Sequence, residues 1–179
     1  MNAKLVLDDN TIFEGTLFGK KINIEGELVF NTSMVGYPES LTDPSYKSQI
    51  LVLTYPSIGN YGVPPHEKDK KSNILNYFES NKIQISGLII ADYCENHSHW
   101  NSNQTLSDWM EKSGVPGIYG IDTRQLTKII REKGSLKASI ITDNTKAILK
   151  QSNRDLVSHV SNPIITEYNK NSKFKIIIF

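Results

Sequence analysis

Short apolar stretches, separated by turn residues, run along the first 142 positions of the chain. The acidic and amide residues at 8–10 predict a tight reversal between the first two of these stretches. The stretch at 49–55 is apolar almost throughout, so we expect both of its faces to be buried. From this pattern we predict strands at 4–7, 11–18, 26–30, 49–55, 82–91, 117–121 and 137–142.

Apolar residues at helical spacing predict helices at 74–80, 105–112 and 123–134. Gly114 follows the second helix at the position where glycine commonly ends a helix. Asp122 stands directly before the third helix, where its side chain can accept a hydrogen bond from an unpaired backbone N–H. The polar run at 122–124 is therefore explained by a helix cap more simply than by an active site.

The composition changes after the last of these strands. Residues 143–172 are rich in Asn, Lys, Ser and Asp and have few apolar anchors, apart from a short helical pattern around 147–149. We interpret them as a linker between a domain at 1–142 and a new strand at 173–179, KFKIIIF. Strands and helices in this order predict a soluble α+β domain with two ordered loops, at 31–48 and 57–73.

Charge and composition exclude several classes of protein. The chain has 20 Lys and Arg against 19 Asp and Glu, and the basic residues are scattered, which argues against a nucleic-acid partner. No apolar run reaches the length of about 18 residues that a membrane span needs, and the first residues do not resemble a signal or transit peptide. Cys94 is the only cysteine, so the chain has no internal disulfide. We expect a cytoplasmic protein.

Two local patterns contain residues that can take part in catalysis or metal binding. Cys94, Glu95, His97 and His99 lie close together, but zinc sites need paired ligand spacing and a thiol nucleophile needs an oriented base, so a surface loop is favoured. Ser45 lies in the sequence DPSY, which is typical of a β-turn, and no G-x-S-x-G elbow surrounds it. The glycines form no phosphate-binding motif. From local sequence we assign no catalytic residue, no metal ligand and no cofactor.

Two longer segments carry a family resemblance. The segment GELVFNTSMVGYPESLTDPSYKSQILVLTYPSIGNYGVP, followed by GIYGIDTRQLTKIIREKGSL, resembles the amino-terminal domain of the glutamine-dependent small subunit of carbamoyl phosphate synthetase. The resemblance covers about 4–141, and short segments such as YFESNKI and SHW are more similar to the fused eukaryotic enzymes. It implies a layered β/β/α fold with mixed sheets and few helices. It also implies that 173–179 is the first strand of a class I amidotransferase (glutaminase) domain.

The resemblance implies a function for the domain within a larger enzyme. That enzyme makes carbamoyl phosphate from glutamine, bicarbonate and ATP for pyrimidine or arginine synthesis, with ATP and magnesium bound in its synthetase half. This domain would contact the glutaminase domain and the synthetase half, and Ser45 would orient the glutamine. No G-x-C-x-G nucleophile motif occurs in these 179 residues, so we expect the segment alone to be inactive. The alternative is a stand-alone interaction or regulatory module that keeps the fold without enzymatic activity.

Overall fold

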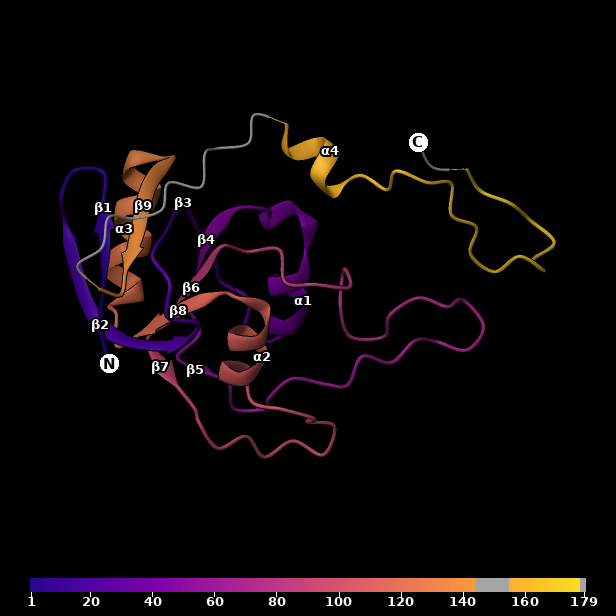
Figure 1. Cartoon of the computed structure of the whole chain (residues 1–179), viewed down its shortest axis with the longest axis horizontal. Helices are drawn as coiled ribbons and strands as arrows, with labels where there is room; N and C mark the ends of the chain where they lie inside the picture. Colours follow the sequence, from indigo (N-terminus) through magenta and orange to yellow (C-terminus); the bar gives the residue numbers. More distant parts are fainter. Residues whose placement is uncertain (144–154, 178–179) are drawn as a thin grey trace.

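The computed structural model describes residues 1–143 and 155–177, and its central feature is a barrel of seven strands (Figure 1). The strands close in the order β1-β2-β8-β6-β4-β3-β9. A separate pair of short strands, β5 (Ser57–Ile58) and β7 (Asp92–Tyr93), lies outside it. The barrel strands are β1 (Asn2–Leu7), β2 (Ile12–Gly19), β3 (Ile24–Asn31), β4 (Gln49–Leu53), β6 (Gly87–Ile89), β8 (Pro116–Tyr119) and β9 (Leu136–Ile141).

Parallel and antiparallel pairs are mixed in this barrel. The strands β3, β4, β6 and β8 form three successive parallel pairs, whereas β1, β2 and β9 make only antiparallel pairs. The mixed pairing and the small number of helices confirm the predicted α+β class. The implied β/β/α layering is not confirmed, because the principal strands close on one another. Mixed pairing arises because most connections after β3 are long loops or helices instead of tight hairpins.

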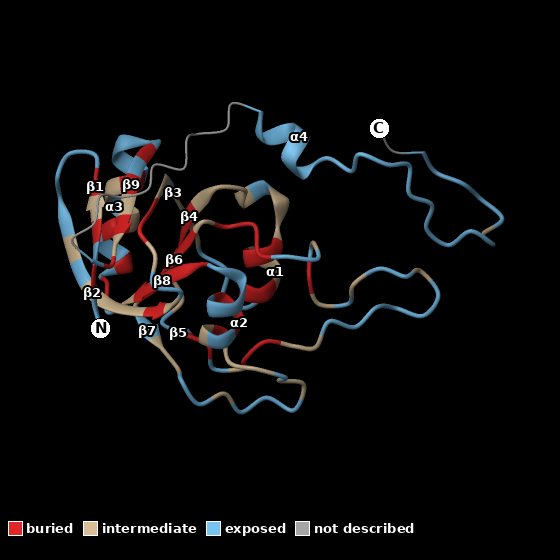
Figure 2. Ribbon diagram, in the orientation of Figure 1, coloured by how far each residue is buried: buried red, intermediate tan, exposed pale blue. Residues whose placement is uncertain are grey.

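Strand β4 supplies side chains to two hydrophobic clusters on its opposite faces. Ile50 and Val52 pack in one cluster, with residues of β1, β3, β9 and the helix α3 (Thr123–Lys133). Leu51 and Leu53 pack in the other, with residues of β6, the long loops and the helices α1 (Tyr37–Thr42) and α2 (Leu106–Ser113). Successive side chains of a strand point to opposite sides, so this alternation places a core on each face. The prediction that both faces of this segment are buried is confirmed, and Figure 2 shows the buried residues concentrated there.

Two helices cover these clusters, and their ends follow the predicted caps. In α2 (Leu106–Ser113) the Thr105 side chain accepts from the Asp108 N–H, and Gly114 ends the helix at a φ of 73°. In α3 (Thr123–Lys133) the Asp122 side chain accepts from the Gln125 N–H at 2.9 Å. The helix predictions at 105–112 and 123–134 are therefore confirmed. The caps are local devices, which is why they were predictable from neighbouring residues alone.

The helix predicted at 74–80 is wrong, because these residues form turns and an irregular segment. The Asp69 carboxylate accepts backbone N–H bonds from Lys71 and Ser72, which fixes a turn just before the segment. The Asp69 N–H then donates to the Ile74 carbonyl, and Asn73 adopts a φ of 61°. The left-handed conformation of Asn73 and the hydrogen bonds of Asp69 reverse the chain here, which prevents a helix from starting.

Other predicted bounds differ in smaller ways. The strand predicted at 82–91 is a strand only at Gly87–Ile89, although its neighbours are buried, and the pair β5–β7 was not predicted. A short helix, α4 (Leu156–Val160), lies in the segment predicted to be a linker. The helical pattern at 147–149 lies outside the described residues. Residues 173–177 form no strand, whereas 178–179 are not described, so their assignment to a glutaminase domain stays a prediction.

Candidate functional site

Ser45 lies on a long connection between β3 and β4, here called the Ser45 loop (residues 32–48). Within it, Pro44–Tyr46 form one turn of 3-10 helix, and the Asp43 side chain accepts a hydrogen bond of 2.8 Å from the Ser45 N–H. The Asp43 carbonyl accepts from the Tyr46 N–H at 3.1 Å, so the predicted turn is confirmed. Ser45 is exposed, and its hydroxyl forms no hydrogen bond with any described residue. That hydroxyl is available to an external partner.

A side chain of the barrel and a backbone N–H of a neighbouring loop hold the Ser45 loop in place. The Asn31 side-chain amide, at the end of β3, donates to the hydroxyls of Ser40 (3.3 Å) and Tyr46 (3.2 Å). The buried Thr42 hydroxyl accepts from the Glu79 N–H at 3.0 Å. These contacts fix the backbone on both sides of Ser45, so its hydroxyl is presented from a defined position. Such side-chain contacts replace the ladder hydrogen bonds that a loop lacks.

Two tyrosines anchor the start of the same loop. The Tyr61 hydroxyl oxygen accepts hydrogen bonds from the Gly36 N–H (2.9 Å) and the Tyr37 N–H (3.1 Å). The Tyr37 hydroxyl in turn donates to the Gly62 carbonyl at 2.5 Å, and the two rings stack with centroids 4.3 Å apart. Burial raises the pKa of both tyrosines above the ordinary value, so both hydroxyls stay protonated near neutral pH. Gly36 has a φ of 85°, a conformation that favours glycine.

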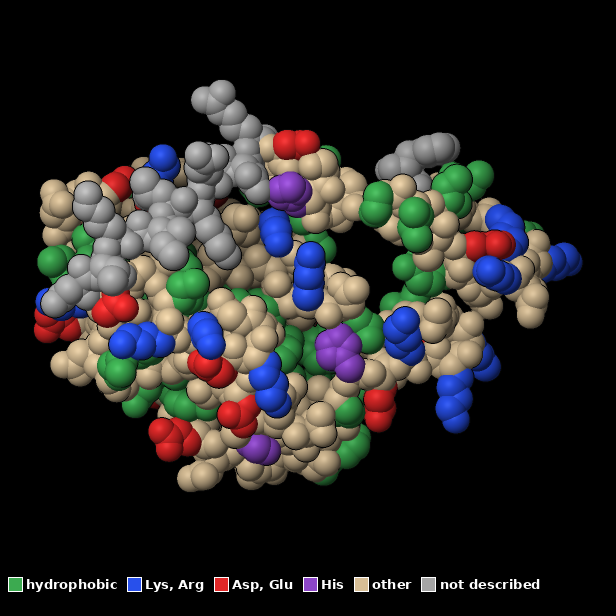
Figure 3. Space-filling view, in the orientation of Figure 1, with side chains coloured by type: hydrophobic (Ala, Val, Ile, Leu, Met, Phe, Trp, Pro, Cys, Tyr) green, Lys and Arg blue, Asp and Glu red, His purple; other side chains and the backbone are tan. Residues whose placement is uncertain are grey.

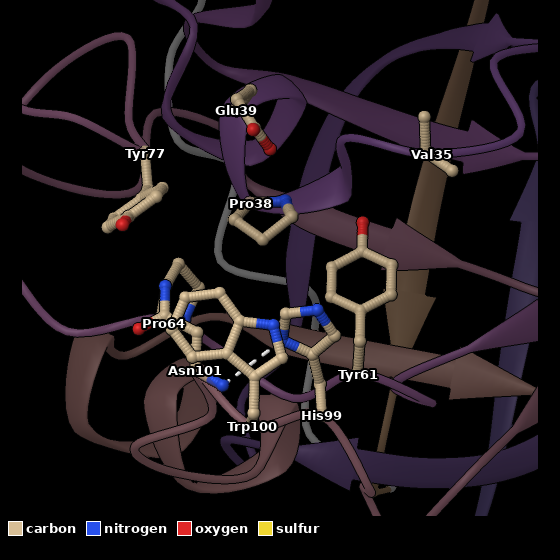
Figure 4. A pocket seen from close by; sticks show the side chains of 9 residues that line it. All are labelled: Val35, Pro38, Glu39, Tyr61, Pro64, Tyr77, His99, Trp100 and Asn101. Carbon is tan, nitrogen blue, oxygen red and sulfur yellow. Dashed lines mark hydrogen bonds between the residues drawn. The ribbon is translucent and has the colours of Figure 1, made fainter.

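A cavity of about 330 Å³, here called the aromatic pocket, opens beside this anchor (Figure 4). Glu39 is the only acidic or basic residue, histidine aside, in its lining. Figure 4 shows Glu39 on one side of Pro38, with Trp100 and His99 on the other. Ser45 does not line this cavity, so the two features are separate sites on one loop. The lining consists of Val35, Pro38, Glu39, Tyr61, Pro64, Tyr77, His99, Trp100 and Asn101.

The Cys94 segment does not assemble as a reactive site. The Cys94 thiol donates to the Asn96 carbonyl at 3.3 Å, and the His99 Nδ1 accepts from the Asn101 N–H at 3.2 Å. Within residues 1–143 and 155–177, no three His, Cys, Asp or Glu side chains come together as a metal would need. His99 instead contacts aromatic rings, with its centroid 6.3 Å from that of Tyr61. The segment is therefore a loop that contributes one wall of the aromatic pocket.

The aromatic pocket was missed by the sequence analysis. Its walls come from three loops, represented by Glu39, Tyr61 and Trp100, and no local periodicity connects residues so far apart. The one available signal was the cluster of aromatic and proline residues in segments predicted to be ordered loops. Trp100 has 86% of its surface exposed, which is unusual for a tryptophan.

Charge on the face drawn in Figure 3 is mixed. Lys and Arg side chains are interspersed there with Asp and Glu, and they form no continuous basic stripe on that face. Among the described residues, no helix has both the length and the apolar character required to cross a membrane.

Comparison with known proteins gives a consistent result. The family model described as carbamoyl-phosphate synthase small chain, CPSase domain, matches residues 5–140. The chain is 48% identical to the multifunctional protein pyr1-3 of Dictyostelium discoideum over 92% of its own length and 8% of that protein. It is 44% identical to the carbamoyl phosphate synthase arginine-specific small chain of Neurospora crassa, over 98% of its length and 40% of that protein. It is 52% identical to the multifunctional protein CAD of Squalus acanthias, over 80% of its length and 6% of that protein. The chain thus spans less than half the length of each of these relatives.

Proposed function

Because this chain belongs to the family of carbamoyl-phosphate synthase small chains through their CPSase domain, we propose that it docks the glutaminase domain and orients glutamine within a glutamine-dependent carbamoyl phosphate synthetase. The match over residues 5–140 is the observation that carries this proposal. In the complete enzyme the domain lies against a glutaminase domain and a synthetase half. ATP and magnesium act in the synthetase half, and carbamoyl phosphate serves pyrimidine or arginine synthesis.

The geometry of the Ser45 loop supports a positioning role. The Ser45 hydroxyl is exposed and has no hydrogen bond to a described residue, while Asp43, Asn31 and Thr42 fix the surrounding backbone. A hydroxyl held in this way loses little conformational freedom when it binds a ligand, which favours orientation of a substrate. It can donate to or accept from the glutamine carboxamide or backbone groups. Nucleophilic attack belongs to a cysteine outside these 179 residues, and the isolated chain is expected not to hydrolyse glutamine.

Hydrogen exchange tests the docking part of this proposal. We compare the backbone amides of the 179-residue chain with the same amides in the complete enzyme, using mass spectrometry. Amides of residues 36–48 should exchange more slowly in the complete enzyme, because the adjoining domain covers them. The reversal at 8–10, between β1 and β2, serves as the control and should exchange equally in both. Equal exchange at 36–48, with slowing elsewhere, would place the interface on another face and overturn the assignment.

A further inference from the structure

Glu39 provides the chemical character of the aromatic pocket. Its carboxylate is half-buried and takes part in no ion pair or hydrogen bond among the described residues. Lys and Arg are absent from the lining of the pocket. A half-buried carboxylate in a cavity lined mostly by apolar and aromatic residues is less well solvated than one on an open surface, so it gains from a cation brought by a ligand. The pocket therefore favours a positively charged group.

Two other polar groups of the pocket are already engaged. The Tyr61 hydroxyl oxygen accepts from two backbone N–H groups, at Gly36 and Tyr37. The His99 Nδ1 accepts from the Asn101 N–H at 3.2 Å, so this nitrogen already has a partner. Neither group competes with a cationic ligand for Glu39. Glu39 is the one carboxylate that the lining offers to a cationic donor.

Aromatic rings form the wall opposite Glu39. The His99 and Trp100 centroids are 5.4 Å apart, and His99 meets the edge of Tyr61 at 6.3 Å. Trp100 is 86% exposed, so its indole face is open to an incoming group. Cations bind the faces of aromatic rings, Trp best of all, and planar guanidinium groups also stack on them. A flat cation that stacks on Trp100 while bonding a carboxylate fits both walls of the cavity.

We propose that the aromatic pocket receives the guanidinium group of an arginine side chain presented by an adjoining part of the same enzyme. The guanidinium would bond the two Glu39 oxygens and stack on Trp100, with its aliphatic stem against Pro38. An ammonium group lacks the planar fork needed to make both contacts, which favours Arg over Lys. The claim that the arginine comes from another part of the same enzyme rests on the proposed function. The claim that the pocket binds a guanidinium group does not. Exposed Val35 and Met34 extend the apolar rim that a protein partner would cover.

A titration of the 179-residue chain tests the chemistry of the pocket. Nα-acetyl-arginine methylamide is added to ¹⁵N-labelled protein, and the indole N–H signals of Trp100 and Trp109 are followed by NMR. Trp109 is 6% exposed and serves as an internal control. We expect the Trp100 signal to shift with a Kd on the order of millimolar, and the Trp109 signal to stay in place. Absence of a saturable Trp100 shift would overturn the proposal.

Variants and a second ligand make the assignment specific. Glu39→Gln keeps the size of the side chain and removes its charge, so the affinity should fall about tenfold. Glu95→Gln, in a carboxylate of the neighbouring loop that does not line the pocket, should leave the affinity unchanged. Nα-acetyl-lysine methylamide should bind more weakly than the arginine compound. Equal affinity for the two compounds, or equal loss in both variants, would contradict guanidinium recognition by Glu39.

Hydroxyl-radical footprinting of the complete enzyme tests the source of the arginine. Trp100 should be oxidised readily in the isolated chain and protected in the complete enzyme, and Glu39→Gln should reduce that protection. An oxidisable Trp100 in the complete enzyme would show that no side chain fills the pocket and would overturn this assignment. The titration of the isolated chain with the arginine compound does not depend on the exchange pattern at 36–48. Loss of the slower exchange there would count against docking by the Ser45 loop, even if the arginine compound still bound to the chain.

Discussion

In the barrel each strand finds its backbone partners on the neighbouring strands, whereas the Ser45 loop combines local turn hydrogen bonds with contacts to side chains. Strand β1, for example, pairs along its length with both β2 and β9. The loop depends on the side chains of Asn31, Thr42 and Tyr61, through which it contacts the end of β3 and two later loops. The first arrangement distributes the stability of the fold over many similar contacts. In the second arrangement a few side chains determine where the loop lies, and the Ser45 hydroxyl remains exposed.

This contrast predicts that a barrel core residue has the largest effect on global stability. Leu5 on β1 is completely buried in the cluster that contains β3, β9 and α3. Leu5→Ala leaves a cavity in closely packed surroundings, and the free energy of unfolding should fall by about 2–5 kcal/mol. Denaturant unfolding followed by circular dichroism measures the change. Ile12→Ala, at a residue with 53% of its surface exposed, is the matched control and should have a much smaller effect.

The loop should respond to loss of a single hydroxyl. Tyr61→Phe keeps the ring but removes the oxygen that accepts from the Gly36 and Tyr37 N–H groups. We expect a loss of roughly 1–3 kcal/mol, with faster amide exchange at those two residues and unchanged exchange in β1. Tyr77→Phe is the matched control, because the Tyr77 hydroxyl has no hydrogen bond to a described residue. If Tyr61→Phe loosened β1 as much as the loop, the two regions would not be independent.

The same contrast explains which parts of the fold the sequence predicts. Apolar patterning located the barrel strands, and local caps located two helices through Asp122 and Gly114. The closure of the barrel was not predictable, because it depends on register between distant strands such as β1 and β9. The helix predicted at 74–80 failed because the turn set by Asp69 overrides the apolar spacing that follows it.

In the candidate sites, too, features set by adjacent residues were predictable and features set by distant residues were not. The turn at Ser45 was predictable, since Asp43 and Pro44 act on adjacent residues. Its role in orienting glutamine came from family resemblance and stays a prediction. The aromatic pocket was not predictable, because Glu39, Tyr61 and Trp100 meet only after the long loops have folded together. Stacking of His66 on Phe78, with centroids 4.5 Å apart, is a further long-loop contact that no periodic pattern specifies.

The central claim is that the loop presents the Ser45 hydroxyl to glutamine, and steady-state kinetics of the Ser45→Ala variant of the complete enzyme test it most directly. Loss of one neutral hydrogen bond of about 0.5–1.5 kcal/mol should raise the glutamine concentration needed for half-maximal synthesis several-fold. Synthesis from ammonia should be unchanged, because it does not use the glutamine site. Ser33→Ala, at an exposed serine of the same loop, should leave both activities unaltered. An unchanged glutamine requirement in Ser45→Ala, or an equal loss of ammonia-dependent synthesis, would contradict the claim.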